Sequence, residues 1–416
     1  MKKLLALLTA LCLIPLSAFP GALAEEEDDL IVEDMVEDVL PPDGSAEEAD
    51  SDPAGAEAAD AAAVADPDST FVDEETGEVF VLTTEEQEKL DSLLEDQPEE
   101  EEGIDPDSLD LNPNLPDNVI NILLIGVDTR SKDPTEIIGR GDTQIIVSVN
   151  RETGAIKMTS ILRDTLISIP GYRNQTKINN SYAYGNNKIK KGTTQEKIRS
   201  GAALAMRTIN KNFEMNIQNY VAINFNGLAS IIDALGGIDI ELTKGEAWYI
   251  NKYLKEHPPA YDNKAKGERT RLEQVAGVQH LDGVQAVMYA RTRSLKGEND
   301  FNRTDRQRHL LDLLLQKVMQ DMSIDTLMDL LDVAYSYAAT NMNLETMFNL
   351  AVSLIPALSG LTESGADSLF EQQRIPADDT WKYSTVNGSS VVQFKRSARP
   401  AEDIHNFIYG SYIPAK

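Results

Sequence analysis

The chain has 416 residues, 41 % of them hydrophobic, which allows one large domain or two modest ones with a buried core. Its formal net charge is -31, but residues 25–117 alone hold 36 acidic side chains and a single basic one, Lys89. The acidity therefore belongs to one segment. The near-neutral remainder argues against a strongly basic face of the kind that binds nucleic acid.

The N-terminus has the pattern of a secretory signal peptide over residues 1–24. Lys2 precedes an apolar stretch over residues 4–19, and Ala22-Leu23-Ala24 has the form of a cleavage site. The alternative is a retained membrane anchor, because the apolar run is barely long enough to span a bilayer. Cys12, the only cysteine, lies in this stretch, so no disulfide is expected. We therefore expect an extracytoplasmic protein, either secreted or anchored to the outer face of the cytoplasmic membrane.

Residues 25–117 are rich in Asp, Glu, Ala and Pro, a composition that buries too little apolar surface to offset the entropy of ordering. We expect an acidic disordered linker, with one short helix over residues 84–95. It is either a passive spacer, which we favour, or a tether that reaches through the wall. A catalytic core is expected over residues 118–322. A helical C-terminal part with terminal strands, over residues 323–416, is expected to pack on that core.

Strands and helices alternate through the folded part, which predicts a layered α/β domain. A helix is predicted to end at Gly236-Gly237, because glycine accepts the left-handed conformation found at helix ends. Strands are predicted at 119–127, 143–150, 156–162, 219–225, 238–242, 383–386 and 391–394. Helices are predicted at 196–213, 226–235 and 401–409, and they are expected to dominate 283–357.

Acidic and arginine side chains collect at the ends of the first three predicted strands. They are Asp128, Arg130, Arg140, Asp142, Arg163 and Asp164. Open α/β sheets bind ligands beyond their strand ends. Magnesium takes one or two carboxylates together with phosphate oxygens, and arginine grips phosphate through its planar fork. The pattern therefore predicts a site for a divalent cation and a phosphate. The alternative is ordinary Asp–Arg ion pairing at a loop surface.

Other common catalytic patterns are absent from the sequence. It contains no G-x-x-x-x-G-K-[ST] phosphate loop, no H-E-x-x-H and no G-x-S-x-G. The four histidines, at positions 257, 280, 309 and 405, lack metal-ligand spacing, and each is expected at a surface or boundary position. A histidine-based mechanism is therefore disfavoured.

A second arginine cluster lies between residues 289 and 310. Its members are Arg291, Arg293, Arg303, Arg306 and Arg308. A helix is expected to begin near residues 300–304, with Thr304 and Gln307 at capping-box spacing. One face of that helix carries Arg303, Gln307, Leu311, Leu314 and Val318. A cation in such a buried stripe needs an anion, either a phosphate at the helix N-terminus or an internal carboxylate. Arg306 and Arg308 are expected to be solvated or paired.

Several stretches resemble the LytR–CpsA–Psr family: NILLIGVDTR, GRGDTQIIVSVN, SILRDTLISIPGY, KINNSYAYG and DFNRTDRQ, all between about residues 121 and 319. The resemblance implies a three-layer α/β/α domain with a central mixed sheet flanked by helices. It also implies a wall-associated phosphotransferase that works at the membrane surface. Such an enzyme moves a glycopolymer, of the wall teichoic acid or capsule type, from a polyprenyl-pyrophosphate carrier onto peptidoglycan.

The motif match also assigns site residues. Asp128 and Asp142 would hold Mg²⁺, or Mn²⁺ in its place, and would form the catalytic set with Arg163. The substrate-binding set would be Arg130, Arg140, Arg163, Lys177, Arg291, Arg293, Arg303 and Gln307. The sequence departs from the family pattern at Gly141, Leu162 and Arg308, where serine, proline and glutamine are usual. None of these changes removes a charged group.

Two other functions remain open from the residues. The same side chains suit a polyprenyl-pyrophosphate hydrolase that uses water as the acceptor. A non-catalytic protein that binds polyprenyl phosphates or wall polymers is the other alternative. A transcriptional regulator, and any nucleic-acid partner, is disfavoured by the signal peptide and by the lack of a basic face.

Overall fold

The computed structural model describes residues 70–72, 79–81, 104–129, 136–153, 155–256, 270–292, 306–307, 309–314, 316–317, 337–343, 346 and 371–415. The signal peptide over 1–24 and the helix expected over 84–95 lie outside these residues. Among the described residues, no helix combines the length and apolarity that a bilayer span requires.

A six-stranded mixed sheet forms the centre, in the order β11-β8-β3-β4-β5-β12. Its strands are β3 (Val119–Asp128), β4 (Arg140–Asn150), β5 (Ile156–Ile161), β8 (Asn219–Asn224), β11 (Ala338–Thr340) and β12 (Glu371–Ile375). β8, β3, β5 and β12 run parallel to one another, whereas β4 and β11 run antiparallel to their neighbours. The carboxyl ends of the four parallel strands therefore meet at one end of the sheet, where β4 begins.

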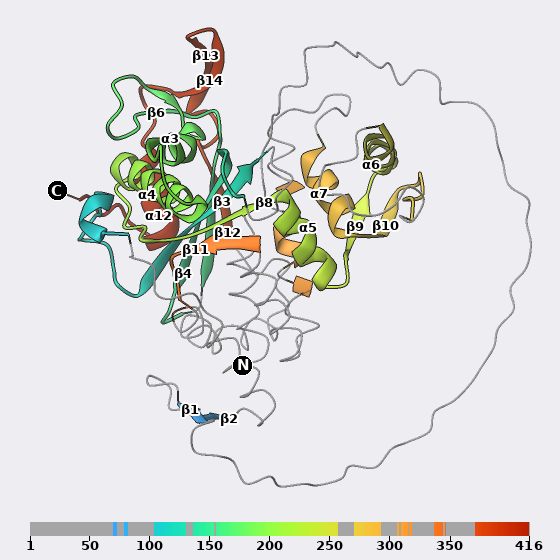
Figure 1. Ribbon diagram of the computed structural model, residues 1–416. Helices are drawn as coiled ribbons and strands as arrows, with labels where there is room; N and C mark the ends of the chain where they lie inside the picture. Colours follow the sequence, from blue (N-terminus) through green and yellow to red (C-terminus); the bar gives the residue numbers. More distant parts are fainter. Residues whose placement is uncertain are drawn as a thin grey trace, which may run out of the picture.

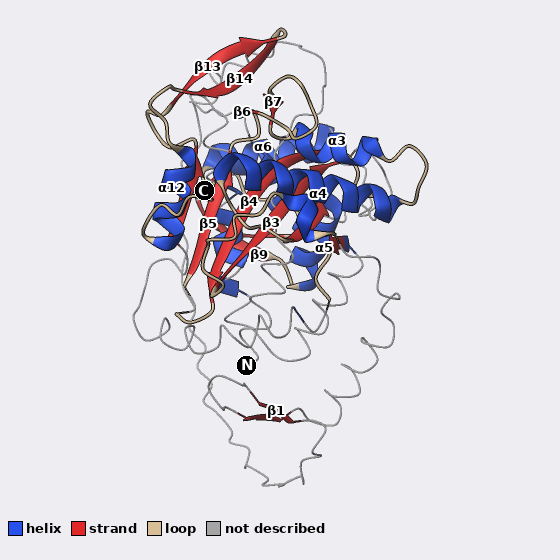
Figure 2. Ribbon diagram, turned by 90° about the vertical axis from the view of Figure 1, so that its left-hand side faces the viewer, coloured by secondary structure: helices blue, strands red, loops and turns tan. Residues whose placement is uncertain are grey.

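Helices cover both faces of this sheet. α3 (Asn180–Lys188), α4 (Thr194–Phe213) and α12 (Pro400–Tyr409) lie on one face, in front of the strands in Figure 2. α5 (Phe225–Ala234) and α7 (Gly283–Arg291) lie on the other side, with α6 (Lys244–Glu256) beyond them (Figure 1). The predicted three-layer α/β/α architecture with a central mixed sheet is confirmed.

The core forms because the central strands are apolar on both faces. Leu123 and Ile125 of β3 pack in one cluster with Ile198 and Ile209 of α4, and all four side chains are fully buried. α4 starts in a capping box in which Thr193 and Glu196 satisfy each other's backbone N–H groups. Replacing a buried leucine of this kind with alanine costs about 2–5 kcal/mol.

Smaller elements complete the described part. One is a 3₁₀ helix (Pro106–Leu109). The others are four two-stranded sheets: β1 (Thr70–Val72) with β2 (Val79–Val81), β6 (Leu166–Ile167) with β7 (Thr176–Lys177), β9 (Ile238–Leu242) with β10 (Gly277–Leu281), and β13 (Trp381–Val386) with β14 (Ser389–Phe394). α5 ends at Ala234, just before the Gly236-Gly237 stop that the sequence predicted, and these two glycines have φ of 76° and 85°. The predicted strands and helices that fall in the described residues are present. The 283–357 segment, however, also contains a strand, β11.

The packed body begins before the boundary expected at residue 117. Leu109 and Leu115 are only 1 % and 4 % exposed. The side chain of Asn112 donates to the carbonyl oxygens of Glu214 and Ile413, each at 2.9 Å. The acidic composition of this segment predicted disorder, but a few buried leucines are enough to pack it against the folded body.

His405 is fully buried, so the surface or boundary position expected for it was wrong. Its Nε2 lies 3.0 and 3.1 Å from the carbonyl oxygens of Phe213 and Glu214, and its Nδ1 lies 3.1 Å from the backbone nitrogen of Ile413. Nε2–H therefore donates and Nδ1 accepts, which requires the neutral ring. Burial lowers the pKa of His405 below its ordinary value.

This histidine makes stability depend on pH. Because folded His405 takes up a proton less readily than the unfolded chain, the free energy of unfolding should fall as pH drops below about 6.5. His405→Gln should flatten that part of the profile. Chemical denaturation between pH 5 and 8 measures this. An unchanged slope in His405→Gln would contradict the assignment.

Candidate functional site

The predicted acidic and arginine residues at the end of β3, at the start of β4 and after β5 lie, in the described structure, at the carboxyl end of the sheet. Asp128 ends β3 and lies opposite Arg140, the first residue of β4. On the other side of β3, Val127 pairs with the last residue of β8, Asn224. Arg163 follows β5 by two residues. Neighbouring strands therefore deliver these groups to one place.

A β-bulge sets the direction of Asp142. Gly126 pairs with Thr143, but Val127 pairs with Gly141, so Asp142 is the extra residue on β4. Bulges of this kind re-aim a side chain beside a site. The start of β4 also comes very close to β3, because a Cβ added at Gly139 would lie 2.1 Å from the Asp128 carbonyl oxygen. Only glycine permits that approach.

The carboxylate of Asp142 is buried and held by two donors. Its Oδ2 lies 3.3 Å from Nη1 of Arg163, and its Oδ1 accepts a 2.6 Å hydrogen bond from Nδ2 of Asn179. The side chains of Asp142 and Arg163 are 0 % and 9 % exposed. An Asp–Arg pair is therefore present, but it is not the loop-surface pair that the sequence left open. Breaking a buried pair by removing one partner costs about 3–5 kcal/mol.

The charges continue from this pair to Lys177. Asp164 Oδ2 lies 3.7 Å from Nε of Arg163, and its Oδ1 lies 2.8 Å from Nζ of Lys177. Lys177 is placed by the short ladder between β7 and β6, where it pairs with Leu166. The result is a row of alternating charge, Asp142–Arg163–Asp164–Lys177, at the end of β5.

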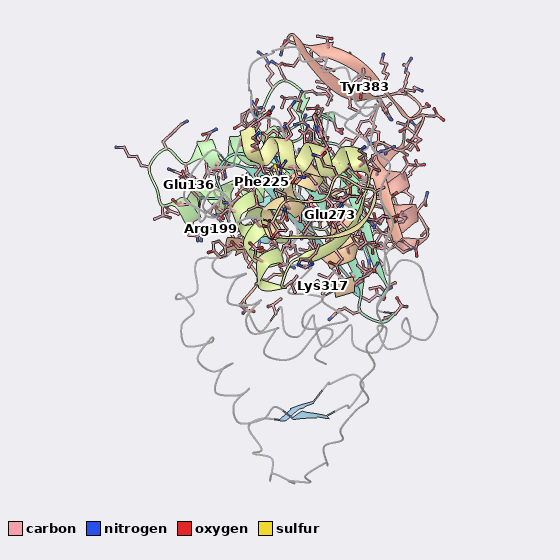
Figure 3. The ribbon with its side chains drawn as sticks, turned by 90° about the vertical axis from the view of Figure 1, so that its right-hand side faces the viewer. Glu136, Arg199, Phe225, Glu273, Lys317 and Tyr383 are labelled. Carbon is pink, nitrogen blue, oxygen red and sulfur yellow. The ribbon has the colours of Figure 1, made fainter. Side chains whose placement is uncertain are left out.

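Arg291 reaches the same end of the sheet from the opposite layer. Its guanidinium carbon lies 4.9 Å from the ring centre of Phe225 and 5.7 Å from that of Tyr253. Phe225 begins α5 directly after β8 and is labelled in Figure 3. Two aromatic faces around one guanidinium hold the cation by cation–π attraction. Arg291 is thereby fixed near the strand ends.

The remaining predicted residues divide into two groups. Gln307 is 4 % exposed and shares a buried helical face with Leu311 and Leu314, as predicted. Arg306, expected to be solvated or paired, is paired and only 8 % exposed. The predictions for Arg130, Arg293, Arg303, Thr304, Arg308 and Val318 lie outside the described residues.

The donor chemistry at the strand ends fits a magnesium ion. Asp128 and Asp142 bring carboxylates from neighbouring strands, and Mg²⁺ needs only one or two of these. Within the described residues, no larger cluster of His, Cys, Asp or Glu suits a metal. Among the buried oxygens without a hydrogen-bond partner in the described structure is Asn179 Oδ1, on the amide that binds Asp142. Such atoms are rare, so a water or ligand would complete this site.

Sequence reasoning missed Asn179. Besides its bond to Asp142, its backbone N–H donates to the Arg163 carbonyl, and its carbonyl accepts from Gly141 N–H at 3.2 Å. It therefore ties β4, the loop after β5 and the start of α3 together. Its place two residues after Lys177, in the same KIN motif, was the available signal.

A family model supports the resemblance. The model of the LytR_cpsA_psr family matches residues 79–398. The chain belongs to this family. The teichoic acid transferase TagU of Oceanobacillus iheyensis (in full, polyisoprenyl-teichoic acid–peptidoglycan teichoic acid transferase) is 30 % identical over 59 % of this chain and 66 % of its own length. The biofilm regulatory protein A of Streptococcus mutans is 30 % identical over 59 % of this chain and 53 % of its own. The chain thus matches less than two thirds of either relative.

Solved structures share the fold of this family member. Protein gbs0355 of Streptococcus agalactiae superposes with a TM-score of 0.53 at 24 % identity, covering 70 % of this chain and 87 % of that one. TagV of Bacillus subtilis gives 0.50 at 22 % identity, covering 72 % and 100 %. At these identities the likeness supports the α/β/α architecture alone.

We expect Asn179→Ala to weaken the site through Asp142. The buried carboxylate loses one donor, so the free energy of unfolding should fall by about 1–3 kcal/mol. Asn187→Ala, on the exposed side of the same helix, is the matched control. Equal stability of the two variants, measured by thermal unfolding, would contradict the role of Asn179.

Proposed function

We propose that this protein is an extracytoplasmic phosphotransferase. It moves a glycopolymer of the wall teichoic acid or capsule type from a polyprenyl-pyrophosphate carrier onto peptidoglycan. The observation that carries the proposal is the buried Asp142–Arg163 pair at the carboxyl end of the sheet. Asp164 links Lys177 to this pair, and Arg291 is held at the same end of the sheet by Phe225. The name of the Oceanobacillus relative, a teichoic acid transferase, supports the substrate class.

The chemistry follows from the charges. A pyrophosphate brings several negative charges, and phosphoryl transfer depends mainly on positioning and on stabilising those charges. Arg163 is held at the end of β5 and Arg291 beside the start of α5, and in this proposal each guanidinium contacts one of the two phosphates. An acceptor hydroxyl attacks the phosphorus that carries the glycan and forms a new P–O bond. The bond to the bridging oxygen breaks, and polyprenyl phosphate leaves.

Two carboxylates have separate roles in this proposal. Both oxygens of Asp142 already accept from Arg163 and Asn179, so this group fixes Arg163 rather than moving a proton. Asp128, half-buried at the strand end, is the better placed base for the acceptor hydroxyl. A magnesium ion held by Asp128 and Asp142 would neutralise phosphate charge. Arg130, Arg140, Arg293, Arg303 and Gln307 stay predicted substrate contacts.

The acceptor distinguishes this function from its alternatives. A hydrolase would release lipid phosphate with water alone, whereas the proposed transferase needs peptidoglycan. A non-catalytic binder would retain its cellular role in Arg163→Ala. The proposed substrates place the protein at the outer face of the cytoplasmic membrane and the wall.

Arg163→Lys should abolish most transfer. Lysine keeps one positive charge but lacks the planar fork that bridges two phosphate oxygens and Asp142. We expect a fall of at least about tenfold, equivalent to about 1.4 kcal/mol of transition-state stabilisation. Arg173→Lys, in the exposed loop between β6 and β7, should keep full activity. Coupling of labelled glycan to isolated peptidoglycan is the measurement. Full activity in Arg163→Lys would refute the assigned role.

Metal removal gives an independent test. EDTA should stop transfer, and excess Mg²⁺ or Mn²⁺ should restore it, because both ions accept carboxylate and phosphate oxygens. The far-UV circular dichroism spectrum should stay unchanged, since the fold has its own core. Undiminished transfer in EDTA, after dialysis against the chelator, would exclude the metal from the proposal.

A further inference from the structure

A buried ion pair lies next to the C-terminal end of α7, where Arg291 is the last residue. We call this the arginine end of α7. Arg306 Nε lies 2.7 Å from Glu246 Oε1, and both side chains are 9 % exposed. Taking two charges out of water costs several kcal/mol per ion, which their attraction offsets only partly. A pair of apolar residues would fill such a position at less cost. The pair therefore calls for a role besides stability.

The pair fixes the backbone where α7 ends. Nη1 of Arg306 donates to the carbonyl oxygen of Thr292 at 3.2 Å. Thr292 is completely buried and directly follows Arg291, the last residue of α7. Arg306 therefore holds the chain one residue away from a guanidinium that the proposed function assigns to the pyrophosphate.

Glu246 is itself locked in place. Its Oε2 accepts from the backbone N–H and from the hydroxyl of Thr243, both at 2.8 Å, and Thr243 Oγ1 accepts from the Glu246 N–H at 3.2 Å. This is a capping box at the start of α6. Burial acts to raise the pKa of Glu246, but the Thr243 backbone N–H and Arg306 hold that pKa below its usual value. The carboxylate therefore stays charged for Arg306.

The same helix holds the side chain of Arg291. Tyr253 lies seven residues after Glu246, which places both residues on one face of α6. Its ring centre is 5.7 Å from the Arg291 guanidinium carbon. α6 thus acts on two successive residues. Tyr253 of α6 contacts the side chain of Arg291, and Glu246 of α6 holds Arg306, which binds the carbonyl oxygen of Thr292.

We infer that α6 positions the arginine end of α7 for the pyrophosphate, with Glu246 and Arg306 as positioning residues that do not touch the substrate. The inference rests on the proposed function. It assigns Arg306 a role that its position in the arginine cluster did not indicate. The two arginines then have different roles. Arg291 contacts the ligand, and Arg306 orients Arg291.

Glu246→Gln tests the inference with little change of shape. Glutamine keeps the capping box but removes the charge that orients Arg306. Glu256→Gln, at the exposed end of the same helix, is the matched control. The probe is farnesyl pyrophosphate with Mg²⁺, titrated calorimetrically into the full chain well below the unfolding temperature. We expect at least about tenfold weaker binding in Glu246→Gln and unchanged binding in Glu256→Gln.

A double variant separates positioning from stability. Glu246→Gln with Arg306→Met removes both charges, so it should unfold at a higher temperature than Glu246→Gln alone. If Glu246 and Arg306 act by positioning, the affinity of the double variant for farnesyl pyrophosphate stays low, because no side chain then orients the Thr292 carbonyl. Wild-type affinity in either variant would overturn the inference. Failure of the wild-type protein to bind the probe would instead refute the proposed function, and the inference with it.

Discussion

The carboxylate of Asp142 is the constraint on which the site depends. A side chain with 0 % exposure stays charged in the interior only if donors meet it. Arg163 and Asn179 do so, and each comes from a different part of the chain. The bulge in β4, the loop after β5 and the first turn of α3 must therefore fit together at one point. Loss of any one of them would leave a buried charge with fewer partners.

The charged groups at this end of the sheet are held in two different ways. The row from Asp142 to Lys177 is anchored on the strand ends, whereas Arg291 is held by aromatic rings from α5 and α6. Phe225 links the two, because it begins α5 where β8 ends beside β3. Cations held at these two places suit the ligand with two phosphates that we propose.

The strands and the charges at their ends were predictable because both are local signals. A buried parallel strand appears as a continuous apolar run, and β3 is such a run. β12 was missed because an edge strand of polar residues, EQQRI, lacks that pattern. Asn179, the bulge and the burial of Arg306 depend on partners far away in the chain, which periodicity does not show. His405 was misplaced for the same reason.

A crystal structure of the protein with a polyprenyl pyrophosphate tests the central claim most directly. The claim predicts that the two phosphates lie at the carboxyl end of the sheet, in contact with the guanidinium groups of Arg163 and Arg291. It also predicts that Asp142 keeps its contacts with Arg163 and Asn179 in that complex. Phosphates bound elsewhere, with these two arginines still turned to protein groups alone, would contradict it.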